Sequence, residues 1–143
     1  MDVVMMGRRP YIKWRLSDMD VEIVLAVLKD LALEELAHGQ FQELSGGQKQ
    51  KILIARALVQ KPELYLFDEP ISFLDIKNQI DIMELARKMV EKENKAVIMV
   101  VHDLNMAMRY SDQIILLKSG EVEAAGLPKS VLNQKHIKEV SGV

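Results

Sequence analysis

The stretch Leu44-Ser45-Gly46-Gly47-Gln48 combines residue types that could bind a phosphate group. Ser45 can cap the start of a helix, and Gln48, three residues later, can close a capping box with it. Gly46 and Gly47 leave the N–H groups of the first helical turn uncovered, and the positive end of a helix attracts anions. On their own, these five residues are explained equally well by a plain capping box.

Two later apolar runs end in side chains that could act on a bound phosphate. Residues 64–67 are followed by Asp68-Glu69-Pro70, and residues 96–101 are followed by His102. Adjacent residues at a strand end point in opposite directions, so Asp68 and Glu69 can take different roles, one holding Mg²⁺ through water and the other orienting an attacking water. Taken alone, the acidic pair also fits a polar strand exit, and His102 fits a loop or capping histidine.

The spacing of apolar and helix-breaking residues predicts the elements that position these side chains. Asp18 or Asp20 can cap a helix whose apolar residues recur at helical spacing up to Leu31, and Gly7 to Pro10 suits the end of an earlier helix. From residue 64 onward, apolar runs typical of strands buried on both faces alternate with helices, which predicts a mainly parallel α/β sheet. The expected strands are 64–67, 96–101, 114–118 and a hairpin partner at 121–125, and the expected helices are 18–31, 34–37, 45–58, 75–90, 103–110, 128–132 and 135–140.

Composition limits the possible classes of protein. The chain has 143 residues, enough for one domain with its own core, and a formal net charge of −2, which argues against a general nucleic-acid-binding protein. It has no cysteine, which excludes a disulfide framework, a thiol nucleophile and a thiolate-bound metal. No apolar run approaches the ~20 residues that span a bilayer, and no export signal is recognisable, so a cytoplasmic location is the default expectation.

In combination, the motifs resemble those of the ATP-binding subunits of ABC transporters. Leu44 to Gln48 matches the ABC signature motif without a mismatch, and Leu64 to Glu69 resembles a Walker B strand followed by the family's glutamate. Ser72 to Asp75 resembles the D-loop, and His102 occupies the place of the switch histidine. The tracts 3–8, 102–105 and 120–126 are most similar to the subunits of iron-siderophore, haem and cobalamin importers.

The resemblance implies a role for each matched position. The signature residues Ser45, Gly46, Gly47 and Gln48 would contact the γ-phosphate of an ATP held by the opposite subunit. Asp68 would organise Mg²⁺, Glu69 would polarise the attacking water, and His102 would contact the γ-phosphate. Ser72 and Asp75, which otherwise indicate a turn and a helix cap, would lie at the interface of an ATPase dimer.

The chain also departs from the family pattern. None of its seven glycines belongs to a G-x-x-x-x-G-K-S/T phosphate cradle, and the family's adenine-stacking aromatic and Q-loop glutamine are missing too. Ile71 stands where the family usually has Thr. The chain therefore resembles the C-terminal half of a nucleotide-binding domain: an α-helical subdomain with the signature at 1–60, then an incomplete P-loop NTPase core at 61–143.

The missing half has a structural consequence. In the family the Walker A strand lies between the strands expected here at 96–101 and 114–118, so its absence leaves a gap in the sheet, with unpaired edges and uncovered apolar faces. We expect rearrangement or pairing with a second copy to close the gap.

The function implied by the resemblance is that of an ATPase subunit of a metal-chelate importer, peripheral at the inner face of the cell membrane. Its partners would be ATP, membrane permease subunits facing residues 7–39, and a second ATPase subunit. Whether this chain hydrolyses ATP stays open, because the phosphate cradle is absent. The alternative is a non-hydrolytic half-domain that regulates or pairs with complete subunits. A soluble ABC ATPase of repair or translation is disfavoured, because no long coiled coil is inserted between the signature and the Walker B strand.

Overall fold

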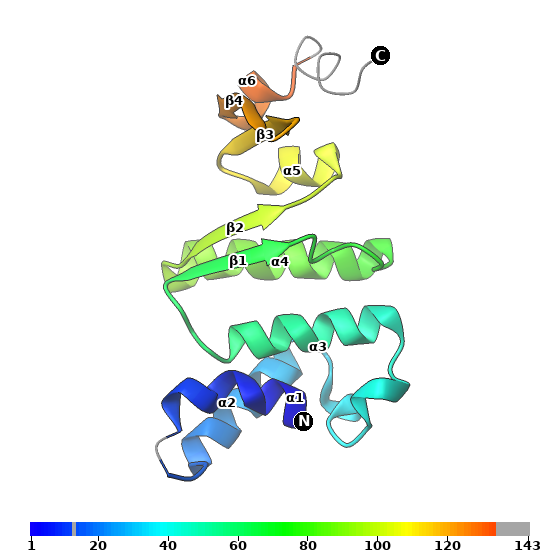
Figure 1. Ribbon diagram of the computed structural model, residues 1–143, viewed down its shortest axis with the longest axis vertical. Coiled ribbons are helices and arrows are strands. Elements are labelled where there is room, and N and C mark those ends of the chain that lie inside the picture. The colour runs from blue at the N-terminus through cyan, green and yellow to red at the C-terminus, as the bar shows by residue number, and fades with distance from the viewer. Residues whose placement is uncertain (13, 134–143) are drawn as a thin grey trace. The chain divides into compact units, whose positions relative to one another are not determined.

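The computed structural model describes residues 1–12 and 14–133. The chain divides into two units, Met1–Met99 and Val100–Val143. The first begins with α1 (Asp2–Met5), the 3-10 helix η1 (Met6–Tyr11), α2 (Asp18–Asp30) and two more 3-10 helices, η2 (Glu34–Leu36) and η3 (Phe41–Glu43), and continues with α3 (Gly46–Leu58), β1 (Leu64–Asp68), α4 (Ile76–Glu93) and β2 (Ala96–Val100) (Figure 1). The second contains α5 (Leu104–Tyr110), β3 (Ile114–Lys118), β4 (Glu121–Gly126) and α6 (Pro128–Val131).

The N-terminal helices pack into a cluster around α3. Val4 of α1, Val24 and Leu28 of α2, and Ala55 of α3 are almost completely buried and form its apolar interior. Gly7 lets η1 approach the end of α3, because a Cβ at this position would lie 2.2 Å from the backbone oxygen of Arg56. The helical cluster therefore depends on one backbone contact that a side chain would prevent.

The beginnings of the first helices differ in detail from the prediction. Ser17 caps α2, and Asp20 is the third helical residue that closes the box, whereas Asp18 or Asp20 was the expected cap. A serine followed three residues later by an acid satisfies two free backbone donors reciprocally, so it takes the cap position. Pro10 is the last residue but one of η1 and does not stop it before Tyr11, because at this position the missing N–H of proline removes one hydrogen bond only.

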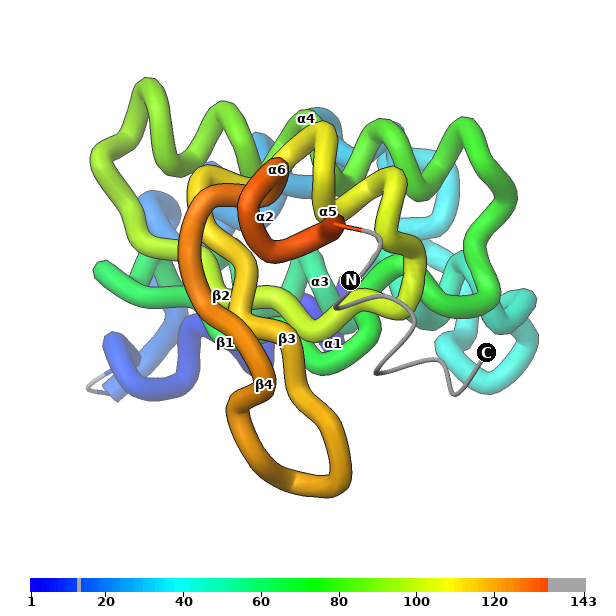
Figure 2. Tube along the Cα trace, turned by 90° about the horizontal axis from the view of Figure 1, so that it is seen from above, coloured from blue at the N-terminus to red at the C-terminus, as the bar shows by residue number. Residues whose placement is uncertain are grey.

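β1 and β2 form a two-stranded parallel sheet, and α4 connects them and covers one face (Figures 1 and 2). Alternation along β1 puts Tyr65, which is 4% exposed, on the covered face and Leu64 and Leu66 on the other. On β2, Ile98 and Val100 are likewise exposed. The prediction that both strands are buried on two faces is wrong for this chain, because no described residue of the first unit covers the second face.

The second unit is a hairpin with two helices. β3 and β4 pair antiparallel, with Ile114 opposite Gly126 and an irregularity between Leu116 and Leu117. Ser119 and Gly120, both at positive φ, form the connecting turn, as expected of a tight hairpin. The core of this unit is built from Ala107, Ile114, Val131 and Leu132.

Most predicted elements are confirmed, including α3, α4, α5 and the hairpin. The helix predicted at 135–140 lies outside the described residues. Within the described residues, β1–β2 and β3–β4 are two separate sheets, so no strand re-pairing closes the gap expected between 96–101 and 114–118. Pairing with a second copy stays a prediction.

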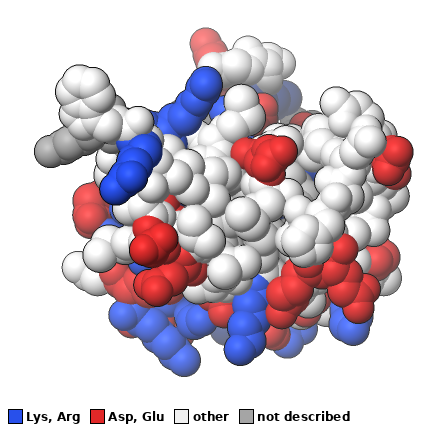
Figure 3. Space-filling model, turned by 90° about the horizontal axis from the view of Figure 1, so that it is seen from below, with Lys and Arg blue, Asp and Glu red and all other residues white. Residues whose placement is uncertain are grey.

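Two surface properties bear on the class of protein. Among the described residues, no helix has both the length and the apolar character needed to cross a bilayer. Figure 3 shows one face of the molecule, on which basic and acidic side chains alternate around an uncharged area. Interspersed charges of both signs partly cancel, so the described part of this face does not present a field of a single sign.

Candidate nucleotide-binding site

The start of α3 carries the capping box that the sequence predicts. The Gln48 backbone N–H donates to Ser45 Oγ at 3.3 Å, and the Ser45 N–H donates to Gln48 Oε1 at 2.9 Å. Ser45 and Gly46 are exposed, and a Cβ added at Gly46 would meet no atom within 4 Å. The first turn of α3 is therefore open on the side of Gly46, where an anion could approach the positive end of the helix.

The first two turns of α3 also contact the segment that follows β1. A Cβ added at Gly47 would lie 3.3 Å from Leu74 Cδ2 and 3.6 Å from the Phe73 carbonyl oxygen. One turn later, Gln50 Nε2 donates to the carbonyl oxygen of Pro70 at 3.2 Å. The predicted signature and D-loop segments thus lie against each other, although 20 or more residues separate them in sequence.

Asp68 and Glu69 differ in their surroundings at the end of β1. Asp68 is exposed, whereas Glu69 is half-buried and its Oε2 accepts a hydrogen bond of 3.0 Å from the Ser72 hydroxyl. Glu69 also has a positive φ of 48°, which turns the chain sharply after the strand. The two adjacent carboxylates are therefore presented differently, and their separate roles stay a prediction.

Asp75 caps α4. Its Oδ1 accepts the Asn78 backbone N–H at 2.9 Å, and its Oδ2 accepts the Asn78 side-chain amide at 2.6 Å. The backbone hydrogen bond from Asn78 lowers the pKa of Asp75 the most, and the positive charge of Lys51 on α3 lowers it further. The cap therefore holds a carboxylate in its charged form beside the signature helix.

A surface depression of about 570 Å³ lies between these segments. One side is formed by the signature residues Ser45, Gly47 and Gln48, and another by Phe73, Leu74 and Asp75. Lys51 lies among the lining residues and supplies a positive charge. The structure thus brings three of the four predicted signature residues together with Asp75, one of the two predicted interface residues.

His102 belongs to the second unit and is exposed. The next residue, Asp103, caps α5 by accepting the N–H groups of Asn105 and Met106 at 2.8 and 3.0 Å. The cap on Asp103 is confirmed, and the role of His102 toward a phosphate stays a prediction.

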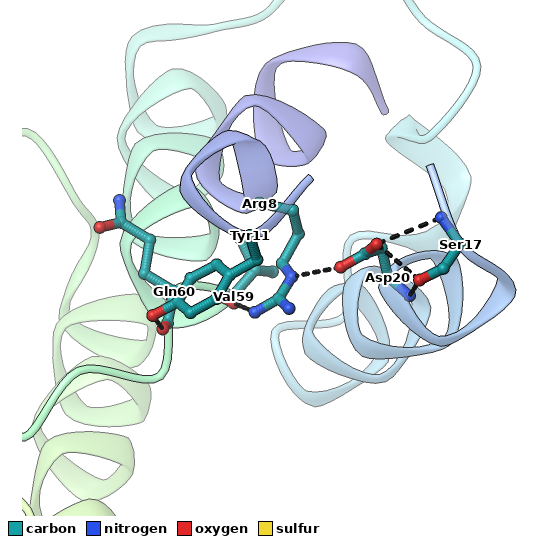
Figure 4. A network of polar contacts seen from close by, with 6 residues as sticks. All are labelled: Arg8, Tyr11, Ser17, Asp20, Val59 and Gln60. Carbon is teal, nitrogen blue, oxygen red and sulfur yellow. Dashed lines mark hydrogen bonds and ion pairs between the residues drawn. The ribbon is translucent and has the colours of Figure 1, made fainter. Parts of the chain in front are cut away.

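A polar network around the buried ion pair of Arg8 and Asp20 lies at the other end of α3 and was not found from the sequence (Figure 4). Arg8, 8% exposed, donates from Nε to Asp20 Oδ1 and from Nη1 to the carbonyl oxygen of Val59, both at 2.8 Å. The Tyr11 hydroxyl donates to the carbonyl oxygen of Gln60 at 2.6 Å, and the Arg8 guanidinium lies 4.2 Å from the centre of the Tyr11 ring. Arg8 and Tyr11 therefore satisfy carbonyl groups that the end of a helix leaves free.

Asp20 anchors the same network from α2. Its Oδ2 accepts the Ser17 hydroxyl at 2.6 Å and the Ser17 N–H at 3.2 Å. The Ser17 hydroxyl and then Arg8 lower the pKa of Asp20, which keeps the carboxylate charged. The spacing of Ser17 and Asp20, a serine followed three residues later by an acid, could have indicated this part of the network. The contact of Arg8 with Val59, 51 residues away, leaves no signal in the local sequence.

The comparisons with known proteins agree with the motifs. Residues 8–72 match the ABC transporter family. The ABC transporter ATP-binding protein MJ0089 of Methanocaldococcus jannaschii is 50% identical over 99% of this chain and 56% of that protein. The petrobactin import ATP-binding protein FpuC of Bacillus anthracis is 38% identical over 99% of this chain and 53% of that protein.

Solved structures show the same fold. An inward-facing ABC transporter assigned to the metal-chelate type matches with a TM-score of 0.90 and 30% identity, over 99% of this chain and 57% of that chain. A dimeric MJ0796 ABC transporter cassette matches with a TM-score of 0.80 and 37% identity, over 87% of this chain and 54% of that chain. The chain spans about half the length of the proteins it matches.

The chain is thus a part-length relative of the ABC transporter ATP-binding proteins, and residues 8–72 match that family's domain. The predicted fold class, an incomplete ABC ATPase core preceded by helices, is confirmed.

Proposed function

We propose that these residues form the signature-bearing part of the ATP-binding subunit of an ABC importer for an iron-siderophore, haem or cobalamin. The observation that carries the proposal is the open first turn of α3, which lies against the segment after β1. Relatives named for petrobactin and cobalamin import support the substrate class. In the complete subunit, ATP hydrolysis would be coupled to transport.

The signature residues Ser45, Gly46, Gly47 and Gln48 would contact the γ-phosphate of an ATP held by a second subunit. The exposure and the position of these residues support this role. Ser45 and Gly46 are exposed, and the dipole of a helix of 13 residues favours an anion at its start. The donors on the side of Gly46 reach outward, so a nucleotide from another subunit could meet them without a rearrangement of α3.

Asp68, Glu69 and His102 would supply the metal and water functions. Asp68 is an exposed carboxylate directly at a strand end, which suits a hard cation. A Mg²⁺ site needs few protein carboxylates, because the ion keeps waters and takes phosphate oxygens. Glu69, fixed by Ser72, would orient the attacking water, and His102 would contact the γ-phosphate. The residues therefore fit a magnesium ion that arrives with the nucleotide.

The proposed partners follow from the same assignment. Ser72 and Asp75 would face a second ATPase subunit, and the helical segment 7–39 would face membrane permease subunits at the inner side of the membrane. Residues 1–60 would form the helical subdomain and 61–143 the C-terminal part of the ATPase core.

A second candidate function is a non-hydrolytic half-domain that pairs with complete ABC subunits. It is favoured by the uncovered face of the β1–β2 sheet, where Leu64, Leu66, Ile98 and Val100 are exposed. An apolar face of this kind indicates contact with another polypeptide. The 143 residues contain no P-loop to bind ATP on their own.

Calorimetric titration of the chain with Mg-ATP tests the first part of the proposal. Without the phosphate cradle we expect dissociation constants of roughly millimolar or weaker and negligible hydrolysis. Tight binding would overturn the assignment of the site as one that acts on a partner's nucleotide.

Complementation separates the two candidate functions. The chain would be mixed with a complete ABC subunit, such as MJ0089, whose own signature serine is replaced. Restored ATPase activity, lost again when the chain carries Gly47→Asp, supports the catalytic proposal, with Met19→Gln as the control on a distant exposed residue. Association without restored activity supports the half-domain, and absence of association contradicts both.

A further inference from the structure

The loop between η1 and α2 carries the most exposed large apolar side chain among the described residues. Trp14 is 98% exposed, and Leu16 on the same loop is 42% exposed. Tyr11, the last residue of η1, is 52% exposed. Figure 1 shows the loop at the outer edge of the helical cluster. An indole ring in this place is unfavourable in water and adds almost nothing to the packing of the fold.

The loop is held at both ends. On the side of η1, the Tyr11 hydroxyl donates to the carbonyl oxygen of Gln60 at 2.6 Å, and the Arg8 guanidinium lies 4.2 Å from the centre of the Tyr11 ring. On the side of α2, Ser17 closes a capping box with Asp20 (Figure 4). Trp14 therefore projects from a loop whose two ends are fixed, so a partner that takes up its ring has little of the protein to order.

Basic side chains flank Trp14. Arg9 and Arg15 are exposed, whereas Arg8 is neutralised by its ion pair of 2.8 Å with Asp20. Among the described residues from 8 to 20, Asp18 is the only exposed acid. It lies in the first turn of α2, where the positive end of the helix offsets its charge. The chain has a net charge of −2, yet the surroundings of Trp14 carry a local excess of positive charge.

An exposed indole between guanidinium groups has the chemistry of a membrane–water interface. Tryptophan is enriched there because its ring is apolar and its N–H is polar, and arginines are attracted to anionic headgroups. A layer of headgroups admits a single projecting ring, whereas a protein partner would need a pocket of matching shape. The loop also belongs to the segment 7–39, which the proposed function turns toward the inner side of a membrane.

We infer that Trp14, with Arg9 and Arg15, contacts the anionic lipid headgroups of a membrane surface; the inference rests on the proposed location of the subunit at the inner face of the membrane. The indole ring would lie among the headgroups, and the two guanidinium groups would bind phosphate oxygens. One ring and two charges give weak, reversible binding. The contact would therefore orient a subunit that its permease partners hold in place.

Trp14 is the only tryptophan of the chain, so its own fluorescence reports the contact. The chain would be titrated with vesicles of phosphatidylcholine and phosphatidylglycerol in equal parts, and with vesicles of phosphatidylcholine alone. With the anionic vesicles we expect the emission to shift to shorter wavelength and to be quenched by brominated lipid chains. Phosphatidylcholine alone, or free inorganic phosphate, should have little effect, and high salt should weaken the response.

Two pairs of variants separate the charges from the ring. Arg15→Gln should lower the partition coefficient ~5-fold, the factor that corresponds to ~1 kcal/mol for one basic residue near an anionic surface. Lys77→Gln removes the same charge from an exposed position on α4 and should change it little. Trp14→Ser, measured by sedimentation with the vesicles, should lower it at least ~5-fold. Phe73→Ser is its control, because Phe73 is 92% exposed but lies outside the loop.

Several outcomes would overturn the inference. They are an emission unchanged by anionic vesicles, an equal shift with phosphatidylcholine alone, and vesicle binding that Trp14→Ser leaves intact. If permease subunits in detergent shift the emission and vesicles do not, Trp14 contacts protein and the lipid contact is wrong. The vesicle titration contains no nucleotide and no second ATPase subunit, so its failure leaves the proposed signature site standing.

Discussion

The two ends of α3 are built in opposite ways. At its C-terminal end, Arg8 and Tyr11 from η1 donate to the carbonyl oxygens of Val59 and Gln60, and Arg8 is buried. At its N-terminal end, the capping box of Ser45 and Gln48 is exposed and uses only residues of the helix start itself.

The C-terminal end of α3 fixes the position of the helix, whereas the N-terminal end leaves backbone donors accessible. The C-terminal end is held by residues about 50 positions away, so its place in the helical cluster is fixed by tertiary contacts. The N-terminal end satisfies its backbone locally and leaves the side of Gly46 open. A helix whose C-terminal end is anchored and whose first turn is open beside Gly46 can present a fixed set of donors to a molecule that is not part of the chain.

The largest effect is expected from Arg8→Met, which keeps the apolar length of the side chain and removes its charge. The loss should lower the free energy of unfolding by about 3 kcal/mol or more, since removing one partner of a buried ion pair leaves the other charge uncompensated. Urea unfolding followed by circular dichroism measures it. Arg9→Met, on the exposed neighbour, should change little. Equal effects of the two substitutions would contradict the contrast between the ends.

A pair of glycine substitutions tests the same contrast through packing. Gly7→Ala places a Cβ 2.2 Å from the Arg56 oxygen, so η1 must move away from α3, and we expect a loss of about 2 kcal/mol. Gly46→Ala meets no atom within 4 Å and should shift the stability by less than about 0.5 kcal/mol. The same urea measurement covers both variants, and a large loss for Gly46→Ala would mean that the signature end is packed after all.

The sequence predicted the exposed end well and the buried end poorly, and the range of the interactions explains why. The capping boxes and caps at Ser45, Asp75 and Asp103 act over two or three residues, so spacing alone indicates them. The bond between Arg8 and Val59 spans 51 residues, and nothing in the local pattern of either residue announces it.

The strands show a second limit. Apolar runs at 64–67 and 96–101 are the pattern of strands covered on both faces, yet Leu66 is 69% exposed. The apolar pattern of a strand shows how much burial the strand is suited to, not how much it has in this chain. Here about half of the length of the matching proteins has no counterpart in the chain. The contact between Gly47 and the Phe73–Leu74 segment likewise required the fold, because the signature and the D-loop were identified separately.

The two serine caps provide a smaller test. Ser45→Ala should cost about 1 kcal/mol, the ordinary value for a lost helix cap. Ser17→Ala should cost more, because the Ser17 hydroxyl also donates to Asp20 at 2.6 Å within the buried network. Thermal unfolding of the two variants under the same conditions compares them. If Ser45→Ala proves the more destabilising, the signature end contributes more to the fold than its exposure indicates.

Acid should affect the two ends unequally, and this is the smallest effect we expect. The hydrogen bond from Ser17 and the contact with Arg8 lower the pKa of Asp20, so near pH 4 the unfolded chain binds a proton more readily than the folded one. The stabilisation is therefore present above the ordinary pKa of an aspartate, about 3.9, and is lost as the pH falls through the lowered pKa of the folded state. The Ser45–Gln48 box contains no titrating group and stays intact.

Unfolding free energies measured in urea between pH 2.5 and 6, roughly the range of carboxylate titration, should fall toward low pH in the wild type and less steeply in Asp20→Asn. Asp75→Asn is the matched control, because the pKa of Asp75 is also lowered, chiefly by the backbone N–H of Asn78, and its loss should remove an independent part of the slope. A wild-type slope that survives unchanged in Asp20→Asn would show that the carboxylate at the buried end of α3 does not couple protonation to folding.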